Sequence, residues 1–554
     1  MTTPALDDSV YESPRRRPRA SRAAALSLPL LAAALTTLSA LALPMPASAQ
    51  SFDTTVLDAR EAFRKRDRVR LAQLRAQSAA EKNPLALWVE YWELTHRIGE
   101  IHPAEFTAFA ERWSGSYVED RMRNDWLLEL GRRRDWNNVA AEFPRFRMND
   151  DREATCYWLV TEQLAGRDVK EAGLAAWLAQ KDADDGCAVL AATLHAAKAL
   201  STADVWKKVR LSVEAGKPKA ARQAAALVSD GVAAAVGDLL ESPAIFLAKK
   251  ASTATRNDAE LAALALVRMA QSDNDTAAAL LADRWERALP AELASWTWAS
   301  IGRQTAMKLQ PAAADQFLRA ARLLTRTGRE IELSDDTLAW KVRAALRADG
   351  GRARWQQVIQ AVNAMSPGEQ KDPAWTYWKA RGLKAIAKDS QESESLLATS
   401  RELFTALASQ LNFYGALAAE ELGQPQALPP RAAPITQAEK DAVTANPGLV
   451  RGLVLVSIGL RGEGVREWNY TIRGMSDREL LAAAQYACDR EVWDRCINTS
   501  DKTKDEIALE QRFPMPLLKD VSARAGEIGL DPAFVYGLIR QESRFIMDAR
   551  SHVG

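Results

Sequence analysis

Histidine and cysteine are scarce in this chain of 554 residues, which contains four of each. No two cysteines form a CxxC pair, and we interpret the histidines as surface or packed residues, namely His96, His102, His195 and His552. Structural and catalytic metal sites are built from close groups of cysteine, histidine and acidic side chains. We therefore expect no metal site.

The chain also has almost no net charge. The sequence has 73 basic and 72 acidic residues, for a formal net charge of +1 at pH 7. Proteins that bind nucleic acids or anionic membranes through their overall charge carry a large basic excess. We therefore expect neither nucleic acid nor a membrane surface as a general partner.

The first 49 residues have the features of an export signal. Basic residues between Arg15 and Arg22 precede an uncharged apolar run over 23–43, and Ala47-Ser48-Ala49 is a small-residue cleavage site. The run is long enough for a membrane anchor, but Pro29 and the Ala-x-Ala site favour cleavage. We expect the mature protein to begin at Gln50 and to have no stable membrane insertion.

The four cysteines predict disulfides, because an exported chain meets an oxidising compartment. Four cysteines allow three connectivities. The pairs that lie near in sequence, Cys156–Cys187 and Cys488–Cys496, best fit bridges between adjacent helices.

Helical spacing dominates the chain after the signal, and alternating strand-like runs are few. Apolar residues recur at helical intervals in segments such as 69–75 and 317–324. Breaks such as Asn83-Pro84 and Asp372-Pro373 separate these segments every few dozen residues. This rhythm is typical of helical hairpins.

A tryptophan pattern recurs and indicates stacked helix pairs in an α-solenoid. The form Trp-x-x-Val occurs at Trp136, Trp206 and Trp355, and aromatic clusters precede Gly302 and Gly382. A large aromatic side chain near a glycine lets two helices interlock. The tryptophans are therefore interpreted as core residues rather than as platforms for stacking sugars.

The C-terminal part divides after a proline-rich linker over 428–434. Residues 435–505 predict a smaller helical domain, with helices over 465–470, 477–488 and 491–497. Leu517, Leu518, Val521, Ala525 and Ile528 then share one helical face, closed by Gly529.

The last helix places a carboxylate among apolar residues. Asp531 and Pro532 are a capping residue and a first helical position, and Phe534, Val535, Leu538 and Ile539 follow on one face. Glu542 continues that face. Burial disfavours a charged carboxylate and raises its pKa, which suits a general acid. A structural ion pair or a helix-end carboxylate is the alternative.

The segment 539–545, Ile-Arg-Gln-Glu-Ser-Arg-Phe, followed by Ser-His-Val-Gly over 551–554, closely resembles the first catalytic motif of the soluble lytic murein transglycosylases. In that family a Glu-Ser-x-Phe motif ends a helix and a Ser-x-x-Gly turn follows. The resemblance implies that Glu542 is the catalytic residue. Ser543 is either a substrate-side hydrogen-bonding residue near that carboxyl group or a helix-end residue. Asp548, the only nearby second acid, is interpreted as a turn residue.

Weaker similarity to the family extends over most of the chain, as in segments 124–131 and 413–419. The resemblance implies an all-α fold: a superhelical, U-shaped solenoid of helical hairpins, a small helical linker domain and the first helices of a lysozyme-like domain. We assign residues 1–49 to the signal, 50–430 to the superhelix, 431–505 to the linker domain and 506–554 to the lysozyme-like part.

The family cleaves the β-1,4 bond between N-acetylmuramic acid and N-acetylglucosamine in peptidoglycan and forms 1,6-anhydromuramoyl ends without water. The resemblance implies this activity in cell-wall turnover, with peptidoglycan glycan strands as the partner, in the periplasm and with no cofactor. Most glycosidases use two carboxylates, whereas here Glu542 would serve both proton transfers.

The sequence stops at Gly554, before the Gly-Leu-Met-Gln motif and the later Asn- and Tyr-containing motifs of the family. A lysozyme-like domain needs roughly a hundred residues to enclose a cleft. The chain is therefore expected to be a truncated copy that is inactive as it stands. Two alternatives remain: a non-catalytic glycan-binding or scaffold protein, and a hydrolase of the goose-lysozyme type.

Overall fold

The computed structural model describes residues 47–324, 331–389 and 391–551, with side chains from residue 53 onward. The expected signal lies almost wholly outside these residues. The chain divides into two units, Met1–Ser51 and Phe52–Gly554, and the second unit is described below. Within the described ranges every regular element is a helix and no strand occurs, so the predicted all-α class is confirmed.

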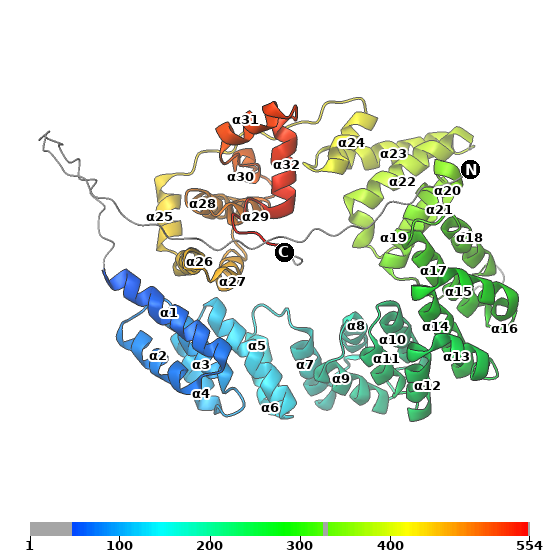
Figure 1. The fold of residues 1–554 in the computed structure, drawn as a ribbon, viewed down its shortest axis with the longest axis horizontal. Helices are drawn as coiled ribbons and strands as arrows, with labels where there is room; N and C mark the ends of the chain where they lie inside the picture. Colours follow the sequence, from blue (N-terminus) through cyan, green and yellow to red (C-terminus); the bar gives the residue numbers. More distant parts are fainter. Residues whose placement is uncertain (1–46, 325–330, 390, 552–554) are drawn as a thin grey trace, which may run out of the picture. The chain divides into compact units, whose positions relative to one another are not determined.

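The N-terminal helices follow one another in chain order, and most of them contact a helix one or two places along the chain (Figure 1). Their bounds are α1 (Ala47–Lys65), α2 (Arg68–Ala80), α3 (Ala86–His96), α4 (Pro103–Arg112), α5 (Tyr117–Arg132), α6 (Trp136–Glu142), α7 (Arg152–Leu164), α8 (Lys170–Ala179), α9 (Asp185–Ala196), α10 (Thr202–Glu214), α11 (Pro218–Ala225) and α12 (Asp230–Glu241).

The middle of the chain continues the same stack of helical hairpins. Its helices are α13 (Pro243–Lys249), α14 (Arg256–Ser272), α15 (Asn274–Leu280), α16 (Glu286–Ala288), α17 (Ala291–Met307), α18 (Ala313–Leu324), α19 (Asp335–Leu346), α20 (Ala348–Gly351), α21 (Trp355–Asn363), α22 (Pro373–Ile386), α23 (Ser393–Ala408) and α24 (Phe413–Glu421). Short turns of other helical types cover Phe143–Arg145, Leu281–Trp285, Glu369–Lys371 and Ala387–Asp389.

The hairpins interlock where the sequence places glycine beside a large side chain. A Cβ atom at Gly302 in α17 would lie 3.3 Å from the ring of Phe317 in α18. At Gly382 in α22 it would lie 3.0 Å from Ile359 in α21. The prediction that the recurring tryptophans belong to the core is confirmed for Trp206, which is 1% exposed.

Two disulfides tie neighbouring helices. Cys156 in α7 is bonded to Cys187 in α9, with their Cα atoms 4.9 Å apart. Cys488 at the end of α28 is bonded to Cys496 in α29, with Cα atoms 5.0 Å apart. Both distances lie in the range that a disulfide requires.

The last eight helices follow a stretch without helix over residues 424–436. They are α25 (Gln437–Ala445), α26 (Pro447–Ser457), α27 (Arg461–Thr471), α28 (Asp477–Cys488), α29 (Trp493–Ser500), α30 (Leu509–Arg512), α31 (Leu518–Glu527) and α32 (Pro532–Ser543). The helix predicted over 477–488 matches α28 at both ends. We call α25–α29 the C-terminal bundle.

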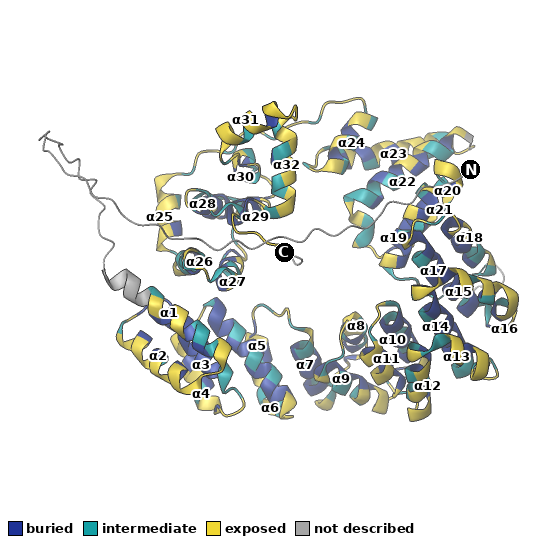
Figure 2. Ribbon diagram, viewed as in Figure 1, coloured by how far each residue is buried: buried dark blue, intermediate teal, exposed yellow. Residues whose placement is uncertain are grey.

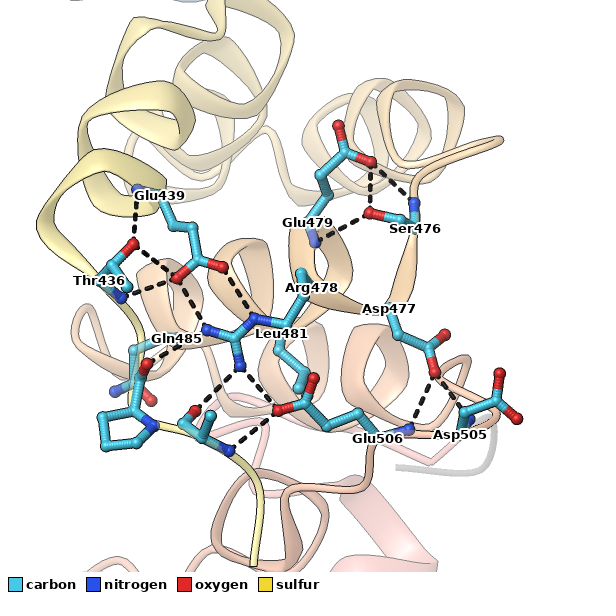
Figure 3. A network of polar contacts seen from close by, with 12 residues as sticks. Thr436, Glu439, Ser476, Asp477, Arg478, Glu479, Leu481, Gln485, Asp505 and Glu506 are labelled. Atoms are coloured by element: carbon cyan, nitrogen blue, oxygen red, sulfur yellow. Dashed lines mark hydrogen bonds and ion pairs between the residues drawn. The ribbon is translucent and has the colours of Figure 1, made fainter.

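Arg478 fastens both ends of the C-terminal bundle (Figure 3). Its guanidinium donates to Glu439 of α25 and to Glu506 after α29, each at 2.8 Å. It also donates to the backbone carbonyls of Ala433 and Pro434. This one side chain therefore holds the linker and the approach to α30 on the start of α28.

The C-terminal bundle also packs on the N-terminal helices. Arg60 of α1 pairs with Glu463 of α27 at 2.6 Å, and Leu455 of α26 lies in the hydrophobic core of α1–α7. The rings of Tyr117 in α5 and Tyr470 in α27 lie 5.9 Å apart, edge to face. Contacts between segments roughly four hundred positions apart thus fix the bundle on which α32 rests.

Candidate functional site

The helix that carries Glu542 begins and ends where the sequence predicts. The Asp531 carboxylate accepts a hydrogen bond of 2.8 Å from the Ala533 N–H, and Pro532 is the first helical residue. At the other end Arg544 adopts a left-handed backbone, with φ of 48°. Glu542 therefore stands in the last turn of α32.

One side of α32 is held against the C-terminal bundle by apolar contacts. Tyr536 and Phe545 are each 8% exposed and cluster with the fully buried Ile497 of α29. Ile539 packs on the same cluster. The Tyr536 hydroxyl donates a hydrogen bond of 2.7 Å to the Pro516 carbonyl, which also ties α32 to the segment before α31.

Arginines on the same side of α32 add polar anchors that the sequence analysis missed. Arg540 donates to Asp501 at 3.0 Å and to the Arg512 carbonyl at 2.8 Å, and it lies 4.8 Å from the centre of the Phe513 ring. Arg544 donates to Asn498. The sequence does contain a signal for these anchors. Positions 536, 540 and 544 recur every four residues and therefore share one side of a helix.

The opposite side of α32 faces solvent. Phe534 is 64% exposed and Leu538 is 52% exposed, and Glu542 follows them at the same spacing of four. Glu542 is itself exposed, and no ion pair or hydrogen bond joins its carboxylate to another described residue. The described residues therefore do not cover Glu542, and they leave part of the predicted apolar face open.

The physical reason is the helical period. Side chains four residues apart lie on the same side of a helix. Positions 534, 538 and 542 therefore lie on one side of α32, and positions 536 and 540 lie on the other. The C-terminal bundle covers the side of α32 that carries Tyr536, and Ile539 also packs against the bundle. The predicted apolar face is thus divided: Ile539 is half-buried, and Phe534 and Leu538 are left open.

The hydrogen bond that the Ser543 side chain makes fits the helix-end alternative. Its hydroxyl donates to the Ile539 carbonyl at 3.3 Å, four residues back along α32. Asp548 lies in an exposed turn, as expected. Of the following turn motif, Ser551 is described and residues 552–554 lie outside the described part of the chain.

The helix before α32 is also open on one side (Figure 2). Ala525 in α31 is 2% exposed and Val521 is half-buried, but Leu517, Leu518 and Ile528 are exposed at 62%, 48% and 70%. The predicted common face of these five residues is therefore only partly covered. Gly529 has a φ of 69° and closes α31, as predicted.

The part of the chain that the structure describes holds neither a candidate metal centre nor a candidate membrane span. No group of three or more histidine, cysteine, aspartate or glutamate side chains there is arranged to hold a metal ion. No helix within the described ranges combines the length and the apolar character that crossing a bilayer requires.

Comparison with known sequences finds relatives that share one name, although no family model matches this chain. It is 20% identical over 487 residues to the soluble lytic murein transglycosylase of Escherichia coli K12, which covers 85% of this chain and 70% of that protein. The Salmonella typhimurium protein of the same name is 21% identical over 489 residues, with the same coverage.

Solved structures give the same result for the fold. A lytic transglycosylase from Pseudomonas aeruginosa, solved as an inactive mutant, matches with a TM-score of 0.62 and 24% identity over 92% of this chain and 79% of that one. The 70 kDa soluble lytic transglycosylase of Escherichia coli matches with a TM-score of 0.57 and 19% identity over 91% and 79%. The resemblance to the soluble lytic murein transglycosylases that the sequence motif predicts is confirmed along most of the chain.

Proposed function

We propose that this chain is part of a peptidoglycan lytic transglycosylase in which Glu542 is the single catalytic acid and base. The observation that carries the proposal is the two-sided placement of α32. Arg540 and Tyr536 anchor one side, and Glu542 stands on the other side with a carboxylate that no described residue engages. An anchored helix with a free carboxylate in its last turn is suited to proton transfer.

The proposed reaction needs one carboxyl group and no water. Glu542, as the acid, gives its proton to the glycosidic oxygen as the bond from that oxygen to C1 of N-acetylmuramic acid breaks. The acetamido oxygen of the same sugar bonds to C1 and holds the positive charge. The Glu542 carboxylate then takes the proton of the C6 hydroxyl, whose oxygen bonds to C1 and releases the acetamido group. The product is a 1,6-anhydromuramoyl end.

The relatives support this assignment. Two proteins similar in sequence carry the name soluble lytic murein transglycosylase, and the Pseudomonas aeruginosa neighbour was inactivated by replacing a glutamate with glutamine. The Escherichia coli neighbour is also known in complex with bulgecin A. A motif centred on one glutamate is consistent with such chemistry.

Location and substrate follow from the same proposal. Residues 1–49 direct the chain to the periplasm and are removed before Gln50, where the protein meets peptidoglycan glycan strands. Intact-mass measurement of the exported protein tests the cleavage site. Retention of the apolar run 23–43 would make the protein membrane-anchored and would contradict this location.

A polypeptide of residues 50–554 is expected to be inactive by itself. Its Glu542 is exposed, so nothing desolvates the carboxyl group or holds a glycan strand in register beside it. Positioning and a water-excluded setting supply much of the rate in such reactions. Residues that cover Phe534 and Leu538 would supply both.

The test compares three proteins on purified sacculi: residues 50–554, the same residues continued through a segment with the Gly-Leu-Met-Gln motif, and the continued protein with Glu542→Gln. The continued protein should release anhydromuropeptides, and the Glu542→Gln change should lower the rate by about 10²–10⁴-fold or more. Reducing ends instead of anhydro ends would indicate a hydrolase. Turnover by residues 50–554 alone would contradict the proposed need for further walls.

The exposed Glu542 also favours a second candidate, a glycan-binding or scaffold protein without turnover. That function predicts that the chain sediments with sacculi and that Glu542→Gln changes neither binding nor product. Loss of anhydromuropeptide release in the continued Glu542→Gln protein would rule it out.

A further inference from the structure

Two adjoining cavities lie where the N-terminal helices meet the C-terminal bundle, on elements other than those that carry Glu542. The larger has a volume of 730 Å³ and lies between the loop before α5 and the helices α26 and α27. The smaller has a volume of 560 Å³. Tyr117, Tyr470 and Arg473 line both, so we treat them as one site, the junction cavity.

The lining of the junction cavity is strongly basic, although the chain as a whole is neutral. The one acidic residue among its lining residues is Asp150. The lining arginines are Arg112, Arg121, Arg147, Arg451, Arg466 and Arg473. Such a local excess attracts anions even where the net charge of the protein is near zero.

Four of these arginines are neutralised by carboxylates within the fold. Arg112 pairs with Glu90, Arg121 with Asp125, Arg147 with Glu119 and Arg451 with Glu467.

The other two, Arg466 and Arg473, have no carboxylate within ion-pair distance among the described residues, and both are exposed. Arg466 lies in α27 four residues before Tyr470, so these two share one side of the helix, and Arg473 lies in the turn just after α27 ends. Arg473 also donates to the Met148 carbonyl at 3.3 Å. The cavity thus has two uncompensated guanidinium groups beside an aromatic ring.

Two helices begin at the wall of the larger cavity. Ser116 caps α5, which has 16 residues, and Asn446 caps α26, which has 11 residues, and both caps line the cavity. The N-terminus of a helix carries a partial positive charge and favours anions. These two ends add to the field of Arg466 and Arg473.

Tyr117 gives an independent sign of a ligand. It is only 6% exposed, yet it lines both parts of the junction cavity, and its hydroxyl has no hydrogen-bond partner among the described residues. Burial raises the pKa of Tyr117, so the hydroxyl stays protonated and able to donate. The hydroxyl oxygen itself is open to the cavity rather than fully buried, so a ligand bound there can accept its hydrogen bond.

We propose that the junction cavity is a second binding site, separate from Glu542, for the carboxylate-bearing stem peptides of peptidoglycan. This inference rests on the proposed function, because it takes the polymer named there as the ligand. The β-1,4-linked sugars carry no free charge once the lactyl group is joined to peptide, so the acidic groups of the polymer lie on its peptides. Arginine forks match carboxylates, Tyr117 supplies a donor, and the rings of Tyr117 and Tyr470 cover the apolar part of a short peptide.

The probe that tests the inference is the free stem tripeptide L-alanyl-γ-D-glutamyl-meso-diaminopimelate, titrated calorimetrically into residues 50–554. The double variant Arg466→Ala, Arg473→Ala should weaken its binding about tenfold or more, because each charge-assisted hydrogen bond contributes substantially. Tyr117→Phe should weaken binding about threefold to tenfold while keeping the ring. Amidation of the tripeptide carboxylates should abolish the difference between wild type and the double variant.

The matched control is Arg287→Ala, Arg352→Ala. These arginines are also exposed and also lack a carboxylate within ion-pair distance among the residues described. Arg287 lies in α16 and Arg352 lies directly after α20, and neither lines the junction cavity, so the control should bind as the wild type does. Equal weakening in both double variants would mean that only general charge matters and would overturn the inference.

Two further outcomes would also overturn it: unchanged binding in the Arg466, Arg473 variant, and binding of inorganic phosphate without binding of the tripeptide. The probe has no glycosidic bond, so its binding does not depend on catalysis. Failure to bind the tripeptide by a protein that cleaves sacculi would reject this inference and keep the proposed function. Tripeptide binding by residues 50–554, together with no cleavage of sacculi by the continued protein, would do the reverse.

Discussion

The indole N–H of Trp88 donates a hydrogen bond of 3.1 Å to the carboxylate of Glu467, a residue 379 positions further along the chain. Both side chains are buried, with Trp88 2% exposed and Glu467 fully buried. Arg451 donates to the other oxygen of the same carboxylate at 2.6 Å. Glu467 therefore joins α3 to α26 and α27 and helps hold the C-terminal bundle on the N-terminal helices.

Replacing Glu467 with alanine should destabilise the protein by about 3 kcal/mol, because it leaves the buried Trp88 N–H without its acceptor and the half-buried Arg451 without its counter-ion. Urea unfolding followed by circular dichroism measures the change. Trp88→Phe removes one donor and part of the ring and should cost less than Glu467→Ala. Glu527→Ala, at an exposed surface pair in α31, is the control and should leave the midpoint near that of the wild type. An equal effect of Glu467→Ala and Glu527→Ala would contradict the joining role.

Lys208 is a buried cation without a carboxylate partner among the described residues. It is 1% exposed, and its ammonium group donates to the carbonyls of Trp177 and Gln180, each at 2.6 Å, at the end of α8. Desolvation by burial lowers the pKa of Lys208 to about 8 from the usual 10.5. The folded state thus holds this proton less tightly than the unfolded state.

The lowered pKa of Lys208 makes the free energy of unfolding depend on pH. Between about pH 8 and 10.5 the unfolded chain binds more protons at this position, so the free energy of unfolding should rise with pH, by about 3 kcal/mol in all. Below pH 8 the contribution should be constant. Lys208→Met should remove this rise, whereas the exposed neighbour Lys207→Met should retain it. Parallel pH profiles of wild type and Lys208→Met in denaturant titrations would show that the lysine is not desolvated.

The two disulfides should differ in their contribution to stability. The first closes a sequence separation of 31 and the second a separation of 8. Because a longer loop loses more entropy when it is closed, the pair Cys156→Ala, Cys187→Ala should cost about 1 kcal/mol more than Cys488→Ala, Cys496→Ala. Urea titrations of the two double variants under one buffer condition measure the difference. A larger loss from the shorter loop would indicate that local packing, not loop closure, dominates.

Local signals in the sequence were sufficient to place individual helices. Ser476 and Glu479 form a reciprocal capping box at the start of α28, and Asp531 with Pro532 marks the start of α32. These contacts span three or four residues, so their signals are local in the sequence; Asp531 and Pro532 were recognised in this way, whereas for α28 only the helix range was predicted. Spacing alone also indicated helix pairs, as at Gly302.

Contacts between distant segments were not predictable in the same way. Periodicity gives the apolar stripe of a helix but not the neighbour that covers it, so Phe534 and Leu538 were expected to be buried together with Ile539. The pairing of Trp88 with Glu467 depends on the path of the whole chain between them. Likewise, the sequence does not show that Arg466 and Arg473 lack a carboxylate partner, because this depends on where the carboxylates of distant segments lie in the fold.

The position of Glu542 depends on Arg540, two residues before it. Arg540 is the residue of α32 that reaches three partners at once: the Asp501 carboxylate, the Arg512 carbonyl and the Phe513 ring. Two of these are backbone and aromatic contacts that a simple charge cannot replace. Arginine can make them together because its guanidinium is planar and has several donors.

Arg540→Ala should therefore loosen α32 while leaving the rest of the C-terminal bundle folded. Hydrogen–deuterium exchange of the amides in 532–543 should speed up by about tenfold or more, since the loss of hydrogen bonds to a charged group costs roughly 1.5–3 kcal/mol. Arg540→Lys should give an intermediate rate, because the ammonium group can reach Asp501 but cannot form the fork. Two controls bracket the effect: Arg524→Ala, at an 81% exposed side chain in α31, and Glu542→Gln, both of which should exchange as the wild type does. If Arg540→Ala leaves exchange in α32 unchanged, the apolar contacts of Tyr536 and Phe545 alone hold the helix, and the position of Glu542 does not depend on the arginine.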